Sequence, residues 1–476
     1  MNMKLEDVWM LLPEHTVGFG DLEIADGKIA SIDLKPGAVG SSRPGPGARL
    51  VLPGLVNCHG HTAMTLVRGL GGGLPLQRWL NEAIFPVEAK MTPEDIAAGM
   101  AWGAMEMLAG GTTAVADMYD FPGEGGRVLA EIGMKARVCR VGLSFVPGRL
   151  QDCVGFTRSF NATAISNSQS SISNSQFSIF DSQSSISDSQ SSISDSQSSI
   201  SDSQFSIHDS QSTIDNCQSA IPPVLADLCI HSEYLTDEKF CRDLAAANRE
   251  LRRPLHVHVS ETRREHEECI ARHGLTPIAY LAKTGLLDFG GYAAHCVWCT
   301  DDDFAIMREK NVTLVHNPSS NMKLGSGFAR VPAAIAAGVN VALGTDGCAS
   351  NDNLDLFEEM HLASLVHKGL AQDPTVLSAW DVIDMATKNG AKALGLADSG
   401  ELKVGTAADL CVVDLAKPHL TPALDLANLV VHSMHASDVV MTLVDGNVLY
   451  DRGQWLTLNQ ERAEFDFRCA VRRLGL

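Results

Sequence analysis

Short apolar runs alternate with longer helix-like stretches through the middle of the chain, a pattern typical of strands and helices taken in turn. The clearest helix is Thr92–Ala109, with Thr92 as its cap, Pro93 at its first position and Gly110 after its end. Eight apolar runs are expected to be strands: Leu50–Cys58, Thr112–Met118, Ala136–Val146, Val224–His231, Leu255–Ser260, Tyr292–Cys296, Val312–His316 and Val339–Thr345. Eight strands with helices between them predict a (β/α)8 TIM barrel of the α/β class, over residues 51–404.

The two chain ends carry a different pattern. Residues 1–50 and 405–476 contain alternating strands, with hairpin turns indicated at Asp26-Gly27 and at Asp445-Gly446. Neither end is large enough for a good core of its own. We therefore expect the two ends to pair into one small β-sandwich domain beside the barrel.

Residues 166–222 repeat a seven-residue unit close to SQSSISD. A coiled coil needs two apolar positions in each heptad, whereas this unit has one isoleucine on a background of serine, a poor helix former. We expect a disordered, low-complexity insertion between the third and fourth strands. A role as a binding segment or as an oligomerisation strand stays open.

Charge and composition narrow the range of partners. With 37 basic and 57 acidic residues the formal net charge is −20, which disfavours nucleic acid and anionic membranes as partners. No apolar run reaches the eighteen residues of a spanning helix, and Glu6 and Asp7 interrupt the apolar start where a signal peptide would need continuity. The twelve cysteines follow no regular frame, so we expect reduced thiols and a cytoplasmic protein.

Histidines occur in pairs at the ends of two predicted strands. His59 and His61 end the first strand, and His256 and His258 lie in the fifth. Residues two apart on a strand point to the same side, so each pair could direct both imidazoles at one ion. Either pair alone is weak evidence.

Further polar residues fall at the same end of the predicted barrel. Glu261 lies just past the fifth strand, His295 ends the sixth, and Asp346 follows the eighth. The carboxyl ends of the strands form the face that carries the active site in such barrels. Together the residues predict a divalent metal site, since imidazole nitrogens with one carboxylate suit zinc, with iron or another divalent ion as alternatives.

Several motifs resemble those of the amidohydrolase superfamily. They are PGLVNCHGHT, HVHVSET, AAHC, HNPSSNMKLGSG and GTDGCASN, and the resemblance covers most of the chain outside the repeat. Within that superfamily the chain is most similar to the 5-methylthioadenosine/S-adenosylhomocysteine deaminases, through the segment TLVRGLGGGLPLQRWLNEAIFPVEAKMT after the first strand.

The resemblance implies one metal ion per subunit, most simply Zn²⁺, with Fe²⁺ or another divalent ion possible. Its implied ligands are His59, His61, His258 and Asp346. Relatives with two metals use a bridging lysine or glutamate at strand three or four. The only lysine in that stretch is Lys135, which precedes strand three and so lies at the wrong end.

The resemblance also implies roles around the metal. Glu261 would shuttle protons and contact the substrate, His295 would hold and polarise the attacking water, and Asp346 would also accept that water's proton. Glu88 would bind ribose hydroxyls and His231 the purine, although Ile230 precedes this histidine where the family usually has proline. His256 is then a barrel residue behind the ligands.

One expected contact has three candidates. An arginine that pairs with a substrate carboxylate should lie between strands three and four, where the sequence offers Arg140, Arg149 and Arg158.

These observations predict hydrolytic deamination of an adenosine-type nucleoside to the inosine analogue and ammonia. The leading substrates are 5′-methylthioadenosine and S-adenosylhomocysteine. Two alternatives remain: a deaminase or related hydrolase of another N-heterocycle (guanine, a pterin, cytosine or a triazine), or a catalytically impaired barrel scaffold. The expected partner is a small nucleoside, without nucleic acid or membrane, and we expect a homo-oligomer.

Overall fold

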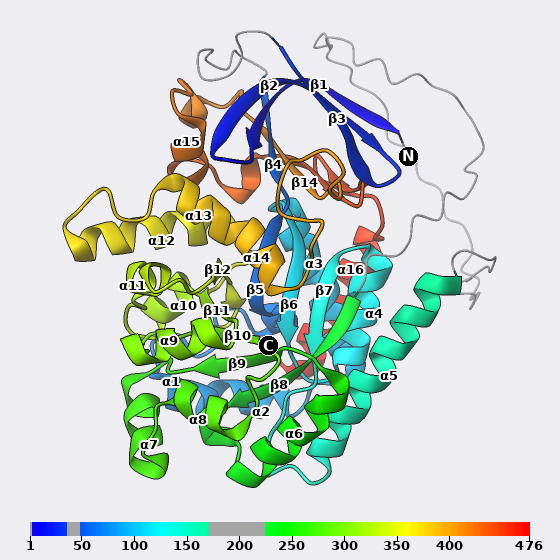
Figure 1. Cartoon of the computed structure of the whole chain (residues 1–476). Coiled ribbons are helices and arrows are strands. Elements are labelled where there is room, and N and C mark those ends of the chain that lie inside the picture. The colour runs from blue at the N-terminus through cyan, green and yellow to red at the C-terminus, as the bar shows by residue number, and fades with distance from the viewer. Residues whose placement is uncertain (1, 36–47, 171–223) are drawn as a thin grey trace, which may run out of the picture.

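The computed structural model describes residues 2–35, 48–170 and 224–476, which form two sheets with helices around them (Figure 1). One sheet has parallel strands and lies at the centre of the molecule. The other is mainly antiparallel and is built from the two chain ends. This confirms the expected α/β barrel with an additional β domain.

The parallel sheet closes into a barrel. Its strands, in order, are β5 (Leu55–His61), β6 (Thr112–Met118), β7 (Lys135–Cys139), β8 (Val224–Ser232), β9 (Leu255–Val259), β10 (Gly291–His295), β11 (Val312–His316), β12 (Val341–Leu343) and β13 (Asp346–Gly347). The short β12 and β13 form the two parts of the eighth strand, since β12 pairs with β11 and β13 pairs with β5. That last pairing joins the eighth strand to the first.

Helices connect the strands and cover the outside of the barrel (Figure 1). Between the first three strands lie α1 (Leu76–Arg78), α2 (Phe85–Glu88), α3 (Pro93–Ala109) and α4 (Pro122–Ile132). The helices from strand three to strand eight are α5 (Arg149–Ser170), α6 (Glu238–Leu251), α7 (Arg263–His273), α8 (Pro277–Thr284), α9 (Asp301–Glu309), α10 (Pro318–Lys323) and α11 (Val331–Ala336). After the barrel come α12 (Leu356–Ala371), α13 (Ala379–Ala386), α14 (Lys388–Ala393), α15 (Leu426–His432) and α16 (Gln460–Leu474).

The helix predicted over Thr92–Ala109 is α3, and its capping is the expected one. The Thr92 side chain accepts a hydrogen bond from the Asp95 backbone, and the Asp95 carboxylate accepts one from the Thr92 backbone. This reciprocal pair satisfies two backbone groups that the helix itself leaves without partners.

The second sheet combines both chain ends in the order β17-β16-β15-β14-β4-β1-β2-β3. Its strands are β1 (Met3–Leu12), β2 (Thr16–Ala25), β3 (Lys28–Leu34), β4 (Arg49–Pro53), β14 (Leu410–Asp414), β15 (Val439–Val444), β16 (Asn447–Asp451) and β17 (Gln454–Trp455). The expected sandwich is thus one continuous sheet. Apolar side chains from both of its halves, among them Leu22 and Leu410, share a single core.

The strand predicted over Leu50–Cys58 is two strands, which corrects that prediction. β4 pairs with β1 and β14 in the second sheet, whereas β5 begins the barrel. The chain passes between the sheets at Gly54, where a Cβ would lie 2.3 Å from the Thr113 side chain. The apolar run is unbroken because both strands are buried, so hydrophobicity alone does not mark the passage.

Two other predicted strands are shorter in the structure. The run Ala136–Val146 is a strand only as far as Cys139, because Val141, Leu143 and Phe145 turn their side chains into a cavity rather than continuing the sheet. The run Val339–Thr345 keeps only its central residues as β12.

The predicted insertion falls mostly outside the described residues. Residues 166–170 complete helix α5, and residues 171–222 lie beyond what the structure describes. The expectation of disorder there stays a prediction.

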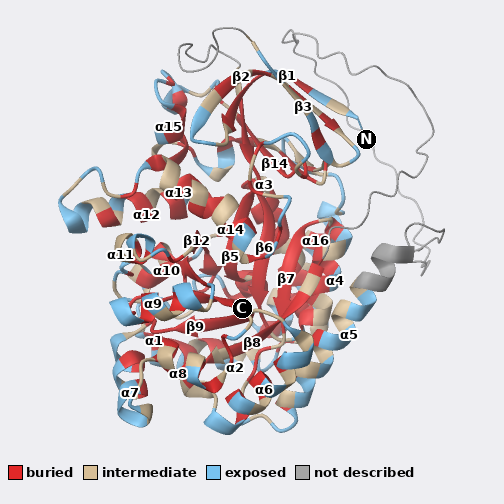
Figure 2. Ribbon diagram, viewed as in Figure 1, coloured by how far each residue is buried: buried red, intermediate tan, exposed pale blue. Residues whose placement is uncertain are grey.

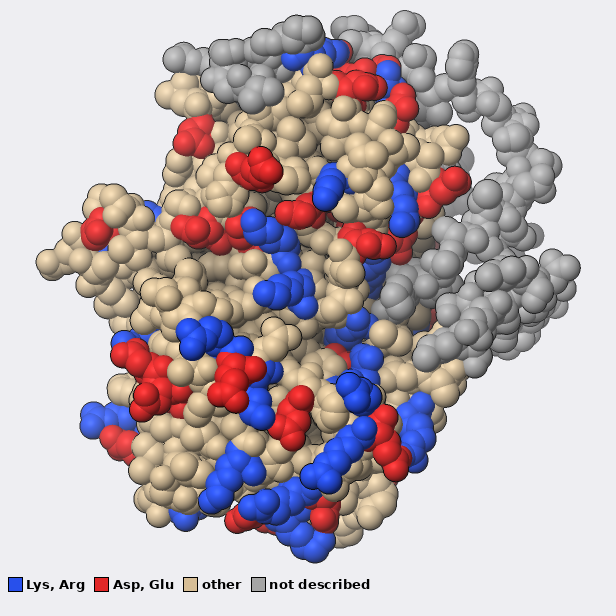
Figure 3. All heavy atoms as spheres, in the orientation of Figure 1, with Lys and Arg blue, Asp and Glu red and all other residues tan. Residues whose placement is uncertain are grey.

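The buried residues lie where the two sheets and the inner faces of the helices meet. Figure 2 shows the barrel strands buried and the outer faces of the helices exposed. In Figure 3, Lys and Arg are interspersed with Asp and Glu over the described part of the face in view. None of the helices in the described ranges is long and apolar enough to cross a membrane.

A buried ion-pair cluster joins the two sheets. Lys135, the first residue of β7, places its Nζ atom 2.7 Å from carboxylate oxygens of Asp409, which directly precedes β14, and of Asp445, which lies in the turn between β15 and β16. The lysine and Asp409 are almost fully buried. Lys135 therefore lies at the amino end of the barrel, where the sequence placed it.

We predict that Lys135→Ala lowers the free energy of unfolding by about 3–5 kcal/mol, because it leaves two carboxylates facing each other without a cation. Urea unfolding monitored by circular dichroism measures the change. Lys239→Ala, which breaks an exposed pair with Asp243, is the control and should leave the free energy of unfolding nearly unchanged. Equal losses in the two variants would contradict the assignment.

Candidate metal centre and its cavity

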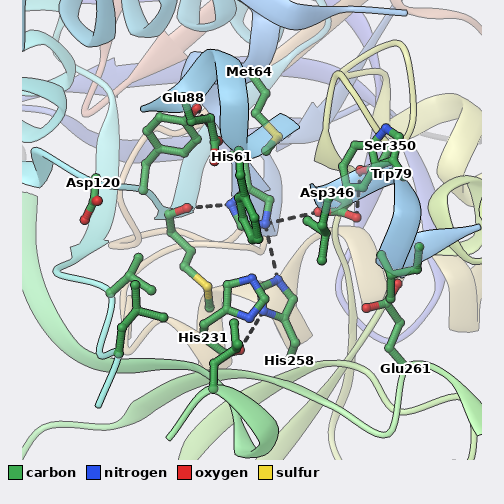
Figure 4. A pocket seen from close by; sticks show the side chains of 18 of the residues that line it. His61, Met64, Trp79, Glu88, Asp120, His231, His258, Glu261, Asp346 and Ser350 are labelled. Atoms are coloured by element: carbon green, nitrogen blue, oxygen red, sulfur yellow. Dashed lines mark hydrogen bonds and ion pairs between the residues drawn. The ribbon is translucent and has the colours of Figure 1, made fainter. Parts of the chain in front are cut away.

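Four side chains predicted as metal ligands converge at the carboxyl ends of the barrel strands. His59 and His61 come from β5, His258 from β9 and Asp346 from β13. One nitrogen or oxygen atom from each lies within 4.8 Å of the others. Figure 4 shows His61, His258 and Asp346 pointing toward one another.

The hydrogen bonds of two of these histidines turn their Nε2 atoms toward each other. The Nδ1 atom of His258 lies 2.7 Å from the His231 carbonyl oxygen, and that of His61 contacts the Met118 carbonyl. A carbonyl can only accept, so each Nδ1 carries a proton and each ring directs its Nε2 at the other. These Nε2 atoms are 3.2 Å apart, which is a stable arrangement only with a cation or a proton between them.

His59 completes the imidazole set. Its Nδ1 is 2.8 Å from Nε2 of His256, whereas its buried Nε2 has no hydrogen-bond partner. The His59 Nε2 atom lies 3.3 Å from the Asp346 carboxylate. His256 therefore stands behind the cluster and orients His59, and the unpartnered nitrogen is directed at the other ligand atoms.

Asp346 is held by two serines. Its Oδ2 accepts from Ser320 Oγ at 2.6 Å and from Ser350 Oγ at 2.8 Å, so Oδ1 is the atom that faces His59 and His61. Burial raises the pKa of this carboxyl, but the two histidines outweigh burial and hold the pKa well below its usual range. Asp346 thus stays an anion among the imidazoles.

A second buried carboxylate supports these serines. Glu359 of α12 accepts from the Ser319 backbone at 3.2 Å and from Asn351 Nδ2 at 2.7 Å. Each contact is one residue away from a serine that holds Asp346. Burial raises the pKa of Glu359 to about 8.

These residues fit a divalent metal ion. Three imidazole nitrogens and a carboxylate oxygen form a donor set suited to zinc and its neighbours among the divalent ions. The orphaned His59 nitrogen and the facing Nε2 atoms are accounted for by a shared cation.

Glu261 and His295 lie beside this cluster. Glu261 follows β9 and is buried, with Oε2 3.9 Å from Nε2 of His295. The Nδ1 atom of His295 is 2.9 Å from Asn321 Oδ1, which leaves its Nε2 toward the cavity. Burial raises the pKa of Glu261, although the nearby His295 opposes that rise. A carboxyl of this kind can hold and release a proton.

A cavity of about 350 Å³ opens onto the cluster. Glu88 and His231, both predicted to touch substrate, line it together with His61, Glu261 and His295. The Tyr119 hydroxyl donates to Glu88 Oε1 at 2.6 Å, and burial raises the pKa of Glu88. Elsewhere the wall is mostly apolar, with aromatic contributions from Trp79, Phe85, Phe121, Phe145 and Tyr234.

The three candidate arginines have different surroundings. Arg149 Nη1 lies 2.7 Å and Arg140 Nη1 3.3 Å from the same oxygen of Asp120, which lines the cavity. Arg158 instead pairs with Glu250 on the surface, at 3.0 Å. The structure therefore places two of the three near the cavity.

Sequence reasoning missed Ser350, Tyr119 and Asp120. Ser350 is part of the motif GTDGCASN, in which only the aspartate stands out as a ligand. Tyr119 and Asp120 directly follow β6. Their polar side chains at the carboxyl end of a predicted barrel strand are a pattern that indicates cavity residues. The apolar pattern predicts strand for Val141, Leu143 and Phe145, whereas the structure places them in the cavity wall.

Comparison with known proteins gives consistent results. The model of the amidohydrolase family matches residues 50–449. The chain is 36% identical over 458 residues to a 5-methylthioadenosine/S-adenosylhomocysteine deaminase of Acetivibrio thermocellus, covering 95% of this chain and 94% of the relative. It is 36% identical over 444 residues to a 5′-deoxyadenosine deaminase of Methanothermobacter thermautotrophicus, covering 93% and 92%.

Among solved structures, the chain is similar to an adenosine deaminase from Xanthomonas campestris with bound zinc. The TM-score is 0.80 at 27% identity, and the match covers 99% of this chain and 98% of the other. The family match extends over most of the chain and includes all four converging side chains. The chain therefore belongs to the amidohydrolase family.

Proposed function

We propose that the protein is a zinc-dependent hydrolytic deaminase of adenosine-type nucleosides. The leading substrates are 5′-methylthioadenosine and S-adenosylhomocysteine, and the products are the inosine analogue and ammonia. The observation that carries the proposal is the placement of Glu88 in one cavity with the histidine–aspartate cluster, Glu261 and His295. The names of the relatives support the same class of reaction.

The predicted metal ligands, and the residues that hydrogen-bond to them, are suited to activating a water molecule for hydrolysis. A divalent ion bound there would make hydroxide available at neutral pH by lowering the pKa of a water molecule toward about 7. Asp346 presents Oδ1 on that side because Ser320 and Ser350 occupy Oδ2. His295, whose Nδ1 is held by Asn321, would orient a water molecule with its other ring nitrogen, Nε2.

Glu261 is suited to move the protons. Attack at C6 of a purine is easier when the ring nitrogen N1 is protonated, and the leaving ammonia also needs a proton. A carboxyl whose pKa is raised by burial can supply the first proton and take up another from the water. The Glu261 backbone N–H is bound by Glu265 at 2.8 Å, which holds the loop that carries the side chain.

Glu88 and His231 are assigned to the substrate. Tyr119 donates to one oxygen of Glu88, so the other oxygen remains for ribose hydroxyls. His231 lines the cavity next to His258, with ring centroids 4.6 Å apart, where it can contact the purine.

Replacing a ligand should remove the metal together with activity. We expect His258→Ala to retain less than about a tenth of the wild-type zinc and no measurable turnover, because the site loses one of its donors. Zinc content per chain, measured by atomic emission after dialysis, tests this. His15→Ala, a histidine on the surface, should keep its zinc. A fully loaded His258→Ala protein would exclude the residue as a ligand.

Replacing the proton shuttle should separate catalysis from metal binding. We expect Glu261→Gln to keep near-normal zinc but to lose about 10²–10⁴-fold in kcat, the usual contribution of general acid–base catalysis. Ammonia release and zinc content are measured on the same preparation. The exposed Glu267→Gln is the control. Full activity, or loss of zinc, in Glu261→Gln would refute the assignment.

Glu88 tests whether the substrate is a nucleoside. We expect Glu88→Gln to lower kcat/KM for 5′-methylthioadenosine by about tenfold to a hundredfold, because a charged hydrogen bond to ribose is lost. Turnover of a free base would be unaffected, since a free base has no ribose. Glu82→Gln, an exposed change on the same segment, is the control. An enzyme that prefers free bases and tolerates Glu88→Gln would instead act on another N-heterocycle.

A further inference from the structure

The cavity wall around Glu88 is carried by a segment outside the barrel. Residues 76–89, between β5 and α3, form the short helices α1 and α2 with a π-helical turn over Trp79–Ile84 between them. Six residues of this segment line the cavity: Leu76, Trp79, Leu80, Phe85, Glu88 and Ala89. Glu88, the last residue of α2, is the one carboxylate among these six.

Apolar packing holds this segment against the barrel but does not direct a carboxylate. Leu76, Trp79, Leu80 and Ile84 share a buried core with residues that follow β5 and with Tyr119. Apolar contacts have no preferred direction, and a glutamate side chain has several rotatable bonds. Hydroxyl groups of a ligand, in contrast, need an acceptor oxygen in a defined place. A directional contact must therefore fix the side chain of Glu88.

Tyr119 makes such a contact. It directly follows β6, and its side chain is buried. Its hydroxyl donates to Glu88 Oε1 at 2.6 Å, whereas the Met91 thioether, at 3.5 Å, is a much weaker acceptor. A distance of 2.6 Å between a phenol oxygen and a carboxylate oxygen is typical of a charge-assisted hydrogen bond. The end of a barrel strand thus holds a carboxylate that the barrel does not carry.

The other carboxylate oxygen of Glu88 is left for a ligand. Within residues 2–35, 48–170 and 224–476, Tyr119 is the one side chain that hydrogen-bonds this carboxylate, and no Lys or Arg pairs with it. Burial raises the pKa of Glu88, and the tyrosine hydrogen bond opposes that rise. The phenol therefore also favours the anion, which is the better acceptor for hydroxyl groups.

The same strand end also holds a predicted metal ligand. The carbonyl of Met118, the last residue of β6, accepts from His61 Nδ1. Tyr119 is the next residue, so two adjacent residues orient His61 and Glu88. Figure 4 shows Glu88 and Glu261 on different sides of His61. The place of the ribose contact relative to the metal cluster is therefore fixed at one strand end.

We propose that Tyr119 is a positioning residue for ribose recognition, which orients the Glu88 carboxylate toward the 2′- and 3′-hydroxyls of the substrate. Tyr119 acts through Glu88 and does not touch the reacting atoms. Its contribution therefore depends on those hydroxyls and disappears for a nucleoside that lacks them. This inference rests on the proposed deaminase function and on the assignment of Glu88 to ribose.

The test compares 5′-methylthioadenosine with its 2′,3′-dideoxy analogue, which keeps the base and the 5′-substituent but has no hydroxyls on the sugar. With the zinc-loaded wild type, kcat/KM for the dideoxy analogue should be about tenfold to a hundredfold lower, as expected when hydrogen bonds to a charged group are lost. Ammonia release measures both rates.

Tyr119→Phe keeps the ring and removes only the hydroxyl. It should lower kcat/KM for 5′-methylthioadenosine by about tenfold and that for the dideoxy analogue by less than about twofold, with zinc content unchanged. In a Glu88→Ala background the same change should have no further effect on 5′-methylthioadenosine, because the group that Tyr119 positions is gone.

Tyr280→Phe is the matched control. It removes another buried phenol hydroxyl, from α8, and Tyr280 is not among the described residues that line the cavity. Its kcat/KM for both nucleosides should equal that of the wild type.

The outcomes are distinguishable. A Tyr119→Phe enzyme that is unaffected, that loses zinc, or that loses activity equally on both nucleosides overturns the inference while the deaminase function stands. An undiminished effect of Tyr119→Phe in the Glu88→Ala background does the same. A wild type that uses both nucleosides equally well removes the ribose role of Glu88 and the inference with it. If the wild type releases ammonia from neither nucleoside, the proposed function itself fails.

Discussion

The site depends on the closure of the barrel between its first and last strands. β13 pairs with β5 through Asp346 opposite Gly60 and Gly347 opposite His61. This pairing brings residues almost three hundred positions apart in the chain within the reach of one ion. Two glycines make the approach possible, since a Cβ at Gly344 would lie 2.9 Å from His59 Cβ and one at Gly347 would lie 2.6 Å from Met64 Sδ.

Successive layers of hydrogen bonds orient the four predicted ligands that this closure brings together. Carbonyl acceptors at Met118 and His231 determine which imidazole nitrogens carry protons, and two serines determine which oxygen of Asp346 is free. Behind the serines, Glu359 ties their two segments together. Hydrogen bonds therefore orient the ligand side chains, which is the usual condition for a tight and reactive metal site.

The cavity is organised by polarity as well as by shape. Its inner end contains the histidines and the acidic groups suited to proton transfer, and its outer wall is apolar and aromatic. Glu88 and Asp120 also line the cavity, and Asp120 pairs with Arg140 and Arg149 behind the wall. Polar and apolar side chains thus occupy different parts of one cavity, contributed by different strand ends.

Patterns in the sequence predict the barrel and the pairing of the chain ends, and the resemblance to amidohydrolases singles out the four converging side chains from the histidines and acidic residues at the strand ends. Strands with helices between them have two distinct periodicities, and histidines two apart on a strand must share a face. The division of one apolar run between two sheets at Gly54 became visible only in the folded chain, since both parts are buried and look alike in sequence. Only the tertiary structure shows that Val141, Leu143 and Phe145 line the cavity and that Asp120 binds both Arg140 and Arg149. Such contacts join segments that no local pattern relates, and they exist only once the barrel has closed.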